Sequence, residues 1–252
     1  MIRLRRVPIP VACLAVLLGN PGQPASTQGL SAKIWVGRYQ EIEEYLRTAE
    51  CVSMQALRFN KVARCTLRAG GPVFSMAWRP LPPGIYGGFW QSYKAEIAAY
   101  ELDKLLKLDM VPPTVERQLQ GNTGSAQLWV ENVFEVKANK SPSASDRADW
   151  EAQLVRMKMF DDLIGNRDRN WGNMLRDATW NLILLDHSRA FGAGTELPHK
   201  LSRIDEGYWA RIESLTRDQL DGALHAWLDE NEIRAILDRR ERMRVDIKSL
   251  PR

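Results

Sequence analysis

Two aspartates and one asparagine in the second half of the sequence have residue types and a spacing that suit metal chemistry. Asp168 is followed five positions later by Asn173, and Asp186 comes directly after the apolar run 182–185. Phosphoryl transfer needs an acceptor for a hydroxyl proton, oxygen ligands for the metal ions on the phosphates, and fixed positive charge. Carboxylate and amide oxygens suit Mg²⁺. The pattern therefore indicates three oxygen ligands brought together at a magnesium site; the alternative is a hydrogen-bonded turn without metal.

Other catalytic motifs are missing from the sequence. It contains no Gly-x-Ser-x-Gly elbow and no Walker loop. His199 and His225 have no partner at zinc spacing, and His187 is interpreted as a structural residue. The aspartate and asparagine set is therefore the leading candidate site.

The loop 166–173 should be held in position by a helix before it and by strands after it. Residues 150–164 have apolar side chains at helical spacing, and Gly165 is a usual C-terminal cap, so a helix should end directly before the loop. Two short strands should follow, separated by the turn 177–179, and the second should run into Asp186.

A second helix is expected upstream. Ser92 is a suitable N-cap, the helix should run to about Leu108, and the prolines at 112–113 prevent it from continuing. Glu96 lies one turn into this helix beside the small residues 98–99, which permit close packing. Its carboxylate can therefore reach a cleft; the alternative is an ordinary solvent-exposed glutamate.

The remaining pattern places strands before helices. It predicts a helix over 37–49, strands over 52–57, 62–67 and 73–78, a loop over 80–84, an extended stretch over 126–133, and helices over 202–250 with Thr216 and Asp229 as N-caps. The polar stretch 139–147 is interpreted as a connection. This order favours an α+β fold with two lobes, a strand-rich N-lobe (28–138) with one important helix and a mostly helical C-lobe (139–252).

At this point the residues resemble a known group of enzymes. The run 160–191 is similar to atypical kinases of the HipA type, to phosphoinositide lipid kinases, and to the secretory-pathway kinases that phosphorylate casein or glycans. The run SYKAEIAAYELDKLLKLDMVPPTVER (92–117) is closest to the secretory-pathway kinases and their bacterial relatives. The resemblance covers roughly residues 45–195 and implies an atypical protein-kinase-like fold.

The resemblance also implies roles for individual residues. Asp168 would be the catalytic base, while Asn173 and Asp186 would be metal ligands. Glu96 would pair with the residue that binds the nucleotide phosphates. ATP and Mg²⁺ (or Mn²⁺) are the implied cofactors, and the acceptor would be a hydroxyl of a protein, a sugar or a lipid.

The sequence departs from this family pattern at two places. Arg79, directly before Pro80, stands where the phosphate-binding lysine is expected. Arginine keeps the charge but has a broader planar group and a different reach. Residues 58–64 also lack a Gly-rich turn that would let backbone amides approach phosphates. These departures leave two hypotheses: an active kinase, or a pseudokinase that binds nucleotide or serves as a scaffold. If Arg79 instead lies on the surface, Lys94 or another lysine would fill its role.

The distribution of charge along the sequence bears on whether the protein binds nucleic acid. The chain has 252 residues and a formal charge of +4, but Arg3, Arg5 and Arg6 supply three of these charges. Without them 32 basic residues face 31 acidic ones. The basicity belongs to the N-terminal tip, so no nucleic acid is expected as a partner.

The tip has the layout of an export signal. Three arginines precede the apolar run 7–19, and small residues follow near Ala25. Residues 1–27 are therefore interpreted as a signal peptide or membrane anchor of an exported protein; a cytoplasmic protein is the alternative. Cleavage would leave Cys51 and Cys65, which would form a disulfide or remain as two buried thiols.

Overall fold

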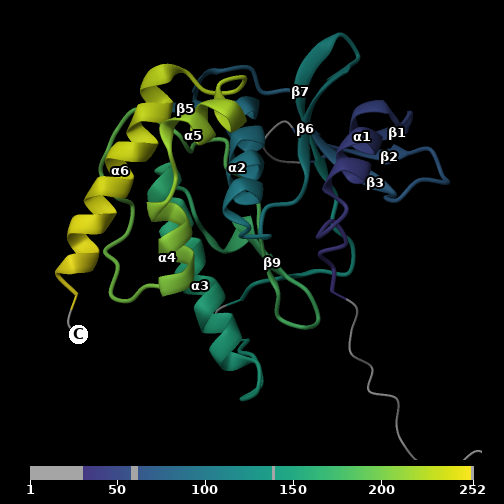
Figure 1. Ribbon diagram of the computed structural model, residues 1–252. Coiled ribbons are helices and arrows are strands. Elements are labelled where there is room, and N and C mark those ends of the chain that lie inside the picture. The colour runs from purple at the N-terminus through teal and green to yellow at the C-terminus, as the bar shows by residue number, and fades with distance from the viewer. Residues whose placement is uncertain (1–30, 58–61, 138–139, 251–252) are drawn as a thin grey trace, which may run out of the picture.

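The computed structural model describes residues 31–57, 62–137 and 140–250. The expected export signal at 1–27 and the expected lobe boundary at 138/139 lie outside these residues. Figure 1 shows a sheet-rich part beside a group of helices, with helix α2 between them. This arrangement confirms the α+β fold with a strand-rich N-lobe and a helical C-lobe.

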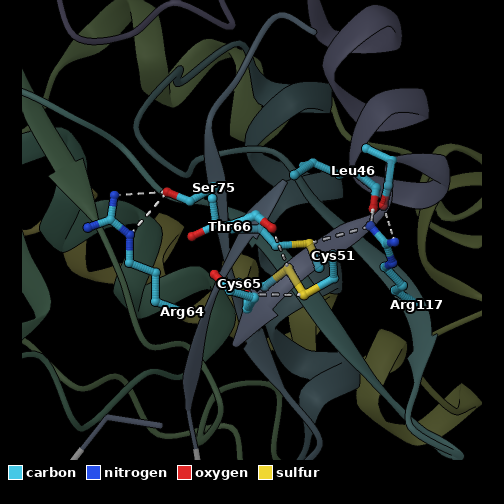
Figure 2. Close-up of a disulfide and its surroundings, with 10 residues drawn as sticks. Leu46, Cys51, Arg64, Cys65, Thr66, Ser75 and Arg117 are labelled. Atoms are coloured by element: carbon cyan, nitrogen blue, oxygen red, sulfur yellow. Dashed lines mark hydrogen bonds between the residues drawn. A yellow bond between two sulfur atoms is a disulfide. The ribbon is translucent and has the colours of Figure 1, made fainter. Parts of the chain in front are cut away.

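The N-lobe is built on an antiparallel five-stranded sheet in the order β1-β2-β3-β7-β6. Its strands are β1 (Cys51–Ala56), β2 (Ala63–Leu67), β3 (Ser75–Arg79), β6 (Thr114–Leu119) and β7 (Asn122–Leu128). Helix α1 (Tyr39–Thr48) packs against β6 and β7. Arg117 of β6 holds the end of α1, because its guanidinium donates to the backbone carbonyls of Leu46 (2.6 Å) and Ala49 (Figure 2).

A disulfide joins the first two strands of this sheet. Figure 2 shows Cys51 of β1 bonded to Cys65 of β2, with an S–S distance of 2.07 Å. The two residues are not direct partners in the register, because Met54 lies opposite Cys65 and the register shifts between Cys51 and Ser53. Of the two alternatives for this pair, the structure has the disulfide.

Helix α2 (Tyr93–Leu106) follows a short hairpin of β4 (Gly84–Tyr86) and β5 (Phe89–Gln91). The Ser92 side chain accepts from Lys94 N, as an N-cap does, and Lys107 ends the helix in the left-handed conformation. Ten of the fourteen residues of α2 are buried. The helix is therefore fixed between the sheet and two C-lobe helices, α4 (Glu206–Glu213) and α5 (Arg217–Leu224).

The C-lobe begins with α3 (Arg147–Ile164), which ends at Gly165 with a φ of 67°. After it come a 3-10 turn (Trp171–Asn173) and the short strands β9 (Met174–Arg176) and β10 (Leu182–Leu184), which form a sheet with β8 (Phe134–Glu135). The last helices are α4 (Glu206–Glu213), α5 (Arg217–Leu224) and α6 (Glu230–Lys248). Thr216 and Asp229 are N-caps, as expected, and both also make capping boxes. Among the described helices, none has the length and apolar character needed to span a membrane.

Candidate active site

A cleft of about 310 Å³ lies between the N-lobe sheet and the loop that precedes β9. Its walls combine apolar side chains from the strands with a group of charged and amide side chains. The lining residues are Leu57, Val62, Ala77, Arg79, Glu96, Ser125, Gln127, Trp129, Gly172, Asn173, Leu185 and Asp186. Four of the five residues expected at the site, all except Asp168, are in this set.

Arg79 is the last residue of β3, where the backbone pairs with Ser125 of β7. One nitrogen of its guanidinium, Nη1, lies 2.7 Å from Glu96 Oε1 and 2.6 Å from Asp186 Oδ1. Burial acts to lower the pKa of Arg79, but the charges of Glu96 and Asp186 raise it more, so the pKa lies above its usual value. Arg79 is therefore a permanent positive charge at the wall of the cleft, and no described contact places Lys94 in that position.

Glu96 is buried on α2, with 4% of the residue exposed. The two oxygens of its carboxylate have different partners: Oε1 accepts from Arg79, and Oε2 accepts from the backbone N–H of His187 at 2.9 Å. The carboxylate thus joins β3 to the segment that follows Asp186. The solvent-exposed alternative for Glu96 is wrong.

Asp186 follows β10 with a φ of 53°, in the left-handed region that few side chains adopt. The Ser188 hydroxyl donates to Oδ1 at 2.8 Å, beside Arg79. Burial acts to raise the pKa of Asp186, but the Arg79 charge, the Arg79 hydrogen bond and the Ser188 hydroxyl together hold it well below its usual range. Asp186 is therefore an ionised carboxylate in the cleft.

Asp168 and Asn173 lie in one loop and contact each other. The Asn173 amide donates from Nδ2 to the backbone carbonyl of Asp168 at 3.0 Å, and Asn166 Oδ1 accepts from Asp168 N at 3.1 Å. The Asp168 carboxylate is 36% exposed and forms an ion pair of 3.2 Å with Arg189. Asn173 thus lines the cleft, whereas Asp168 lies beside it with its carboxylate already paired.

One residue that sequence reasoning missed holds the loop in place. Arg169 is buried, donates to both oxygens of Asp161 at 2.9 Å, and donates to the carbonyls of Asn173 and Leu185 at 2.9 and 2.8 Å. A signal for it existed. Asp161 lies near the C-terminal end of α3, where the helix dipole disfavours a carboxylate, so a cationic partner was to be expected.

Arg169 also contacts His187. Its Nη2 lies 2.9 Å from His187 Nε2. A guanidinium only donates, so this ring nitrogen accepts and the ring proton lies on Nδ1, 3.8 Å from Glu96 Oε2. The contact connects the loop of Asp168 to α2, and it agrees with the structural role expected for His187.

The oxygen donors at the cleft suit a divalent cation only in part. Asp186 and Glu96 supply carboxylates and Asn173 supplies an amide, which are the donors that Mg²⁺ and Mn²⁺ take. Within the described ranges, however, no group of three His, Cys, Asp or Glu residues gathers at one point. Both carboxylates already bind Arg79. A cation bound by this set would share its ligands with a guanidinium.

Comparison with known proteins identifies the fold. No protein-family model matches the sequence, and no curated protein matches it. Three solved structures that match are the Golgi casein kinase with Mn/ADP bound (TM-score 0.63, 15% identity), a hydra Fam20 with sugar (0.64, 17%) and the Helicobacter pylori proinflammatory kinase CtkA (0.52, 12%). The matches cover 83%, 83% and 82% of this chain and 75%, 88% and 99% of the others. The chain therefore has the fold of atypical kinases, which confirms the resemblance to the secretory-pathway kinases and their bacterial relatives at the level of fold.

Proposed function

We propose that the protein is an atypical kinase that uses ATP and a divalent cation, Mg²⁺ or Mn²⁺, to phosphorylate a hydroxyl group. The observation that carries the proposal is the direct contact of Arg79 with both Glu96 and Asp186 at the wall of the cleft. In kinases a cation on this strand pairs with a helix glutamate near the metal-binding aspartate. The same three charges meet here within a kinase fold.

Each of the candidate site residues would have a separate role in phosphoryl transfer. Arg79 supplies fixed positive charge for the phosphates. Asp186 and Asn173 would hold the cation, which offsets the negative charge that develops on the phosphoryl oxygens. Asp168, in the neighbouring loop, would accept the proton of the attacking hydroxyl.

Arg189 must leave Asp168 before that proton can be accepted. The two side chains are 33% and 36% exposed, and such partly exposed ion pairs contribute about 0–1 kcal/mol. An incoming hydroxyl can therefore displace Arg189 at little cost. The resting ion pair does not argue against Asp168 as the base.

The known structures support the choice of cofactors but not a choice of acceptor. The Golgi casein kinase was crystallised with Mn/ADP, which supports nucleotide and divalent metal for this chain as well. The acceptor is proposed to be a hydroxyl of a protein, a sugar or a lipid head group. No nucleic-acid partner is proposed, because the charge balance beyond the N-terminal tip is nearly neutral.

A pseudokinase remains the second candidate because of one residue. Arg79 replaces the expected lysine, and in this structure it binds the carboxylate of Asp186 as well as that of Glu96. Catalysis tolerates little displacement, since about 1 Å can cost on the order of a hundredfold in rate. A protein that binds nucleotide without transferring phosphate would fit the same geometry.

Transfer from radiolabelled ATP to water, to the protein itself and to an extract of its native host tests the proposal. Asp168→Asn should lose at least about a hundredfold in rate, the usual contribution of a general base, with ADP affinity unchanged. Asp238→Asn, which changes an exposed carboxylate of α6, is the matched control. A wild-type protein that binds nucleotide but transfers to no acceptor would favour the pseudokinase. A fully active Asp168→Asn variant would exclude Asp168 as the base.

We also infer that the protein is exported. The layout of residues 1–27 and the disulfide between Cys51 and Cys65 both suit an oxidising compartment. Anchoring to a membrane would involve only the N-terminal segment. Mass spectrometry of the protein from its native host checks this inference, and an intact Met1 would contradict cleavage.

A further inference from the structure

One guanidinium nitrogen serves two carboxylates at the cleft. Arg79 Nη1 lies 2.7 Å from Glu96 Oε1 and 2.6 Å from Asp186 Oδ1. All three side chains are largely buried, with exposures of 13%, 5% and 14%. A positive charge therefore contacts two negative charges in a largely buried site, as a bridging metal ion would.

The shape of the guanidinium leaves donors for a ligand. Arginine has five N–H donors on three nitrogens in a fixed plane. Because both carboxylates bind Nη1, the donors on Nε and Nη2 are the ones that can bind phosphate oxygens. Arg79 can hence contact carboxylates and phosphate together, which the single ammonium group of a lysine does less well.

The Arg79 charge lies where a divalent cation would otherwise offset the repulsion between the carboxylates and the nucleotide phosphates. Two carboxylates at a phosphate site repel the nucleotide, and a cation normally offsets that repulsion. Here Arg79 offsets it already. A cation that binds Asp186 Oδ1 must also compete with a short, part-buried, charge-assisted hydrogen bond from Arg79, which is stronger than one in water.

We propose that Arg79 replaces a divalent cation in nucleotide binding, so that the cleft binds ADP and ATP without metal and needs Mg²⁺ or Mn²⁺ only for transfer. The proposal rests on the proposed function, because it assumes that the cleft takes a nucleotide. In this proposal Arg79 does more than replace the expected lysine, because it also takes the place of a metal ion in nucleotide binding.

Arg79→Lys is the most informative variant, because it keeps the positive charge and removes the forked, planar arrangement of N–H donors on the guanidinium (the fork). The shorter ammonium would lose at least one of the contacts to Glu96, Asp186 and phosphate. A lost hydrogen bond between charged groups corresponds to roughly a tenfold or greater change in affinity. We therefore expect Arg79→Lys to bind nucleotide at least about tenfold more weakly in EDTA than in Mg²⁺, whereas wild-type affinities should agree within about threefold.

The experiment is calorimetric titration of the full protein with ADP and with ATP, in EDTA and in Mg²⁺. Arg68→Lys is the control, because Arg68 is 66% exposed and pairs with Glu50 outside the cleft lining. Thermal unfolding of each variant shows whether it is folded, and wild-type binding only in Mg²⁺ would overturn the proposal even if Arg79→Lys does not fold.

The outcomes separate this proposal from the proposed function. Wild-type binding in EDTA that is lost in Arg79→Lys would support it. Binding only in Mg²⁺ would overturn it and leave the kinase proposal intact. Equal binding in EDTA by wild type and Arg79→Lys would also overturn it, because the fork would then not be the cause. No nucleotide binding under either condition would overturn both.

Discussion

At the scale of single residues, Arg169 has the most consequential position outside the cleft. It forms a buried ion pair with Asp161 and donates to the carbonyls of Asn173 and Leu185. These two carbonyls belong to residues that line the cleft, and Leu185 directly precedes Asp186. Arg169 therefore holds the backbone of Asn173 directly, and that of Asp186 through its neighbour Leu185.

Arg169→Ala should destabilise the protein by about 3–5 kcal/mol, because it leaves the buried Asp161 carboxylate without a counter-charge. Urea unfolding measures this loss. Arg167→Ala, two residues earlier, is the matched control: its ion pair with Glu196 is exposed, and its removal should cost within about 0.5 kcal/mol. Similar losses for the two variants would show that the Asp161 pair contributes no more than a surface contact.

Two of the expected site residues that line the cleft lie in recognisable local patterns. Asp186 follows the apolar strand β10 by two residues, and Glu96 lies one turn after the N-cap Ser92. The partner of Asp161 could not be read in the same way, because Arg169 lies outside the helix and only the fold brings it back. The pairing of Asp168 with Arg189 depends on the conformation of a loop and has no sequence signal.

At the scale of elements, β3 and β7 determine where Arg79 lies. Arg79 pairs with Ser125, and Gly124 lies next to that pair. A Cβ atom at Gly124 would come within 2.7 Å of the backbone carbon of Arg79 and of Pro80 Cα. The absence of a side chain at Gly124 therefore allows the end of β3 to approach β7.

Gly124→Ala should weaken ADP binding by about tenfold or more, because the added methyl must push the backbone of Arg79 away from its place beside Glu96 and Asp186. Gly222→Ala on α5 is the control, since its Cβ would meet nothing within 4 Å and alanine favours a helix. Calorimetry with ADP compares them. Unchanged affinity in Gly124→Ala would mean that the clash relaxes without moving Arg79.

The helix ends expected from the sequence agree with the structure wherever a capping residue is present. Ser92, Gly165, Thr216 and Asp229 all begin or end helices as expected. Strand β6 was missed, because its turn to β7 is formed by Gln120 and Gly121 at φ of 51° and 77°. Two positive φ values define a tight hairpin turn, but glutamine is not one of its usual residues. The β4–β5 hairpin was not expected, because its residues follow a proline-rich loop and do not alternate between apolar and polar side chains.

At the scale of the whole molecule, the two lobes share their cores. The buried alanines of α2 pack with the C-lobe helices, although α2 lies in the N-terminal half of the sequence. Conversely, Ile183 of β10 is buried in the N-lobe core, and Leu175 and Leu185 pack against that core. Neither lobe has a complete hydrophobic core without residues from the other.

We therefore expect one cooperative unfolding transition in urea, despite a length at which separate domain transitions are common. Tryptophan fluorescence and far-UV circular dichroism should give the same midpoint with the disulfide intact. Two midpoints would contradict the shared cores and show that the lobes unfold independently.

The burial of α2 limits how far this helix can move. Many kinases are switched by moving the helix that carries the conserved glutamate. Here Ala98 and Ala99 are fully buried, and the start of α2 is bonded to the segment after Asp186 through Ser92 N and the Ser188 carbonyl at 2.9 Å. An outward swing would open a cavity in the core and break that bond. We therefore expect α2 to stay in place rather than to swing outward.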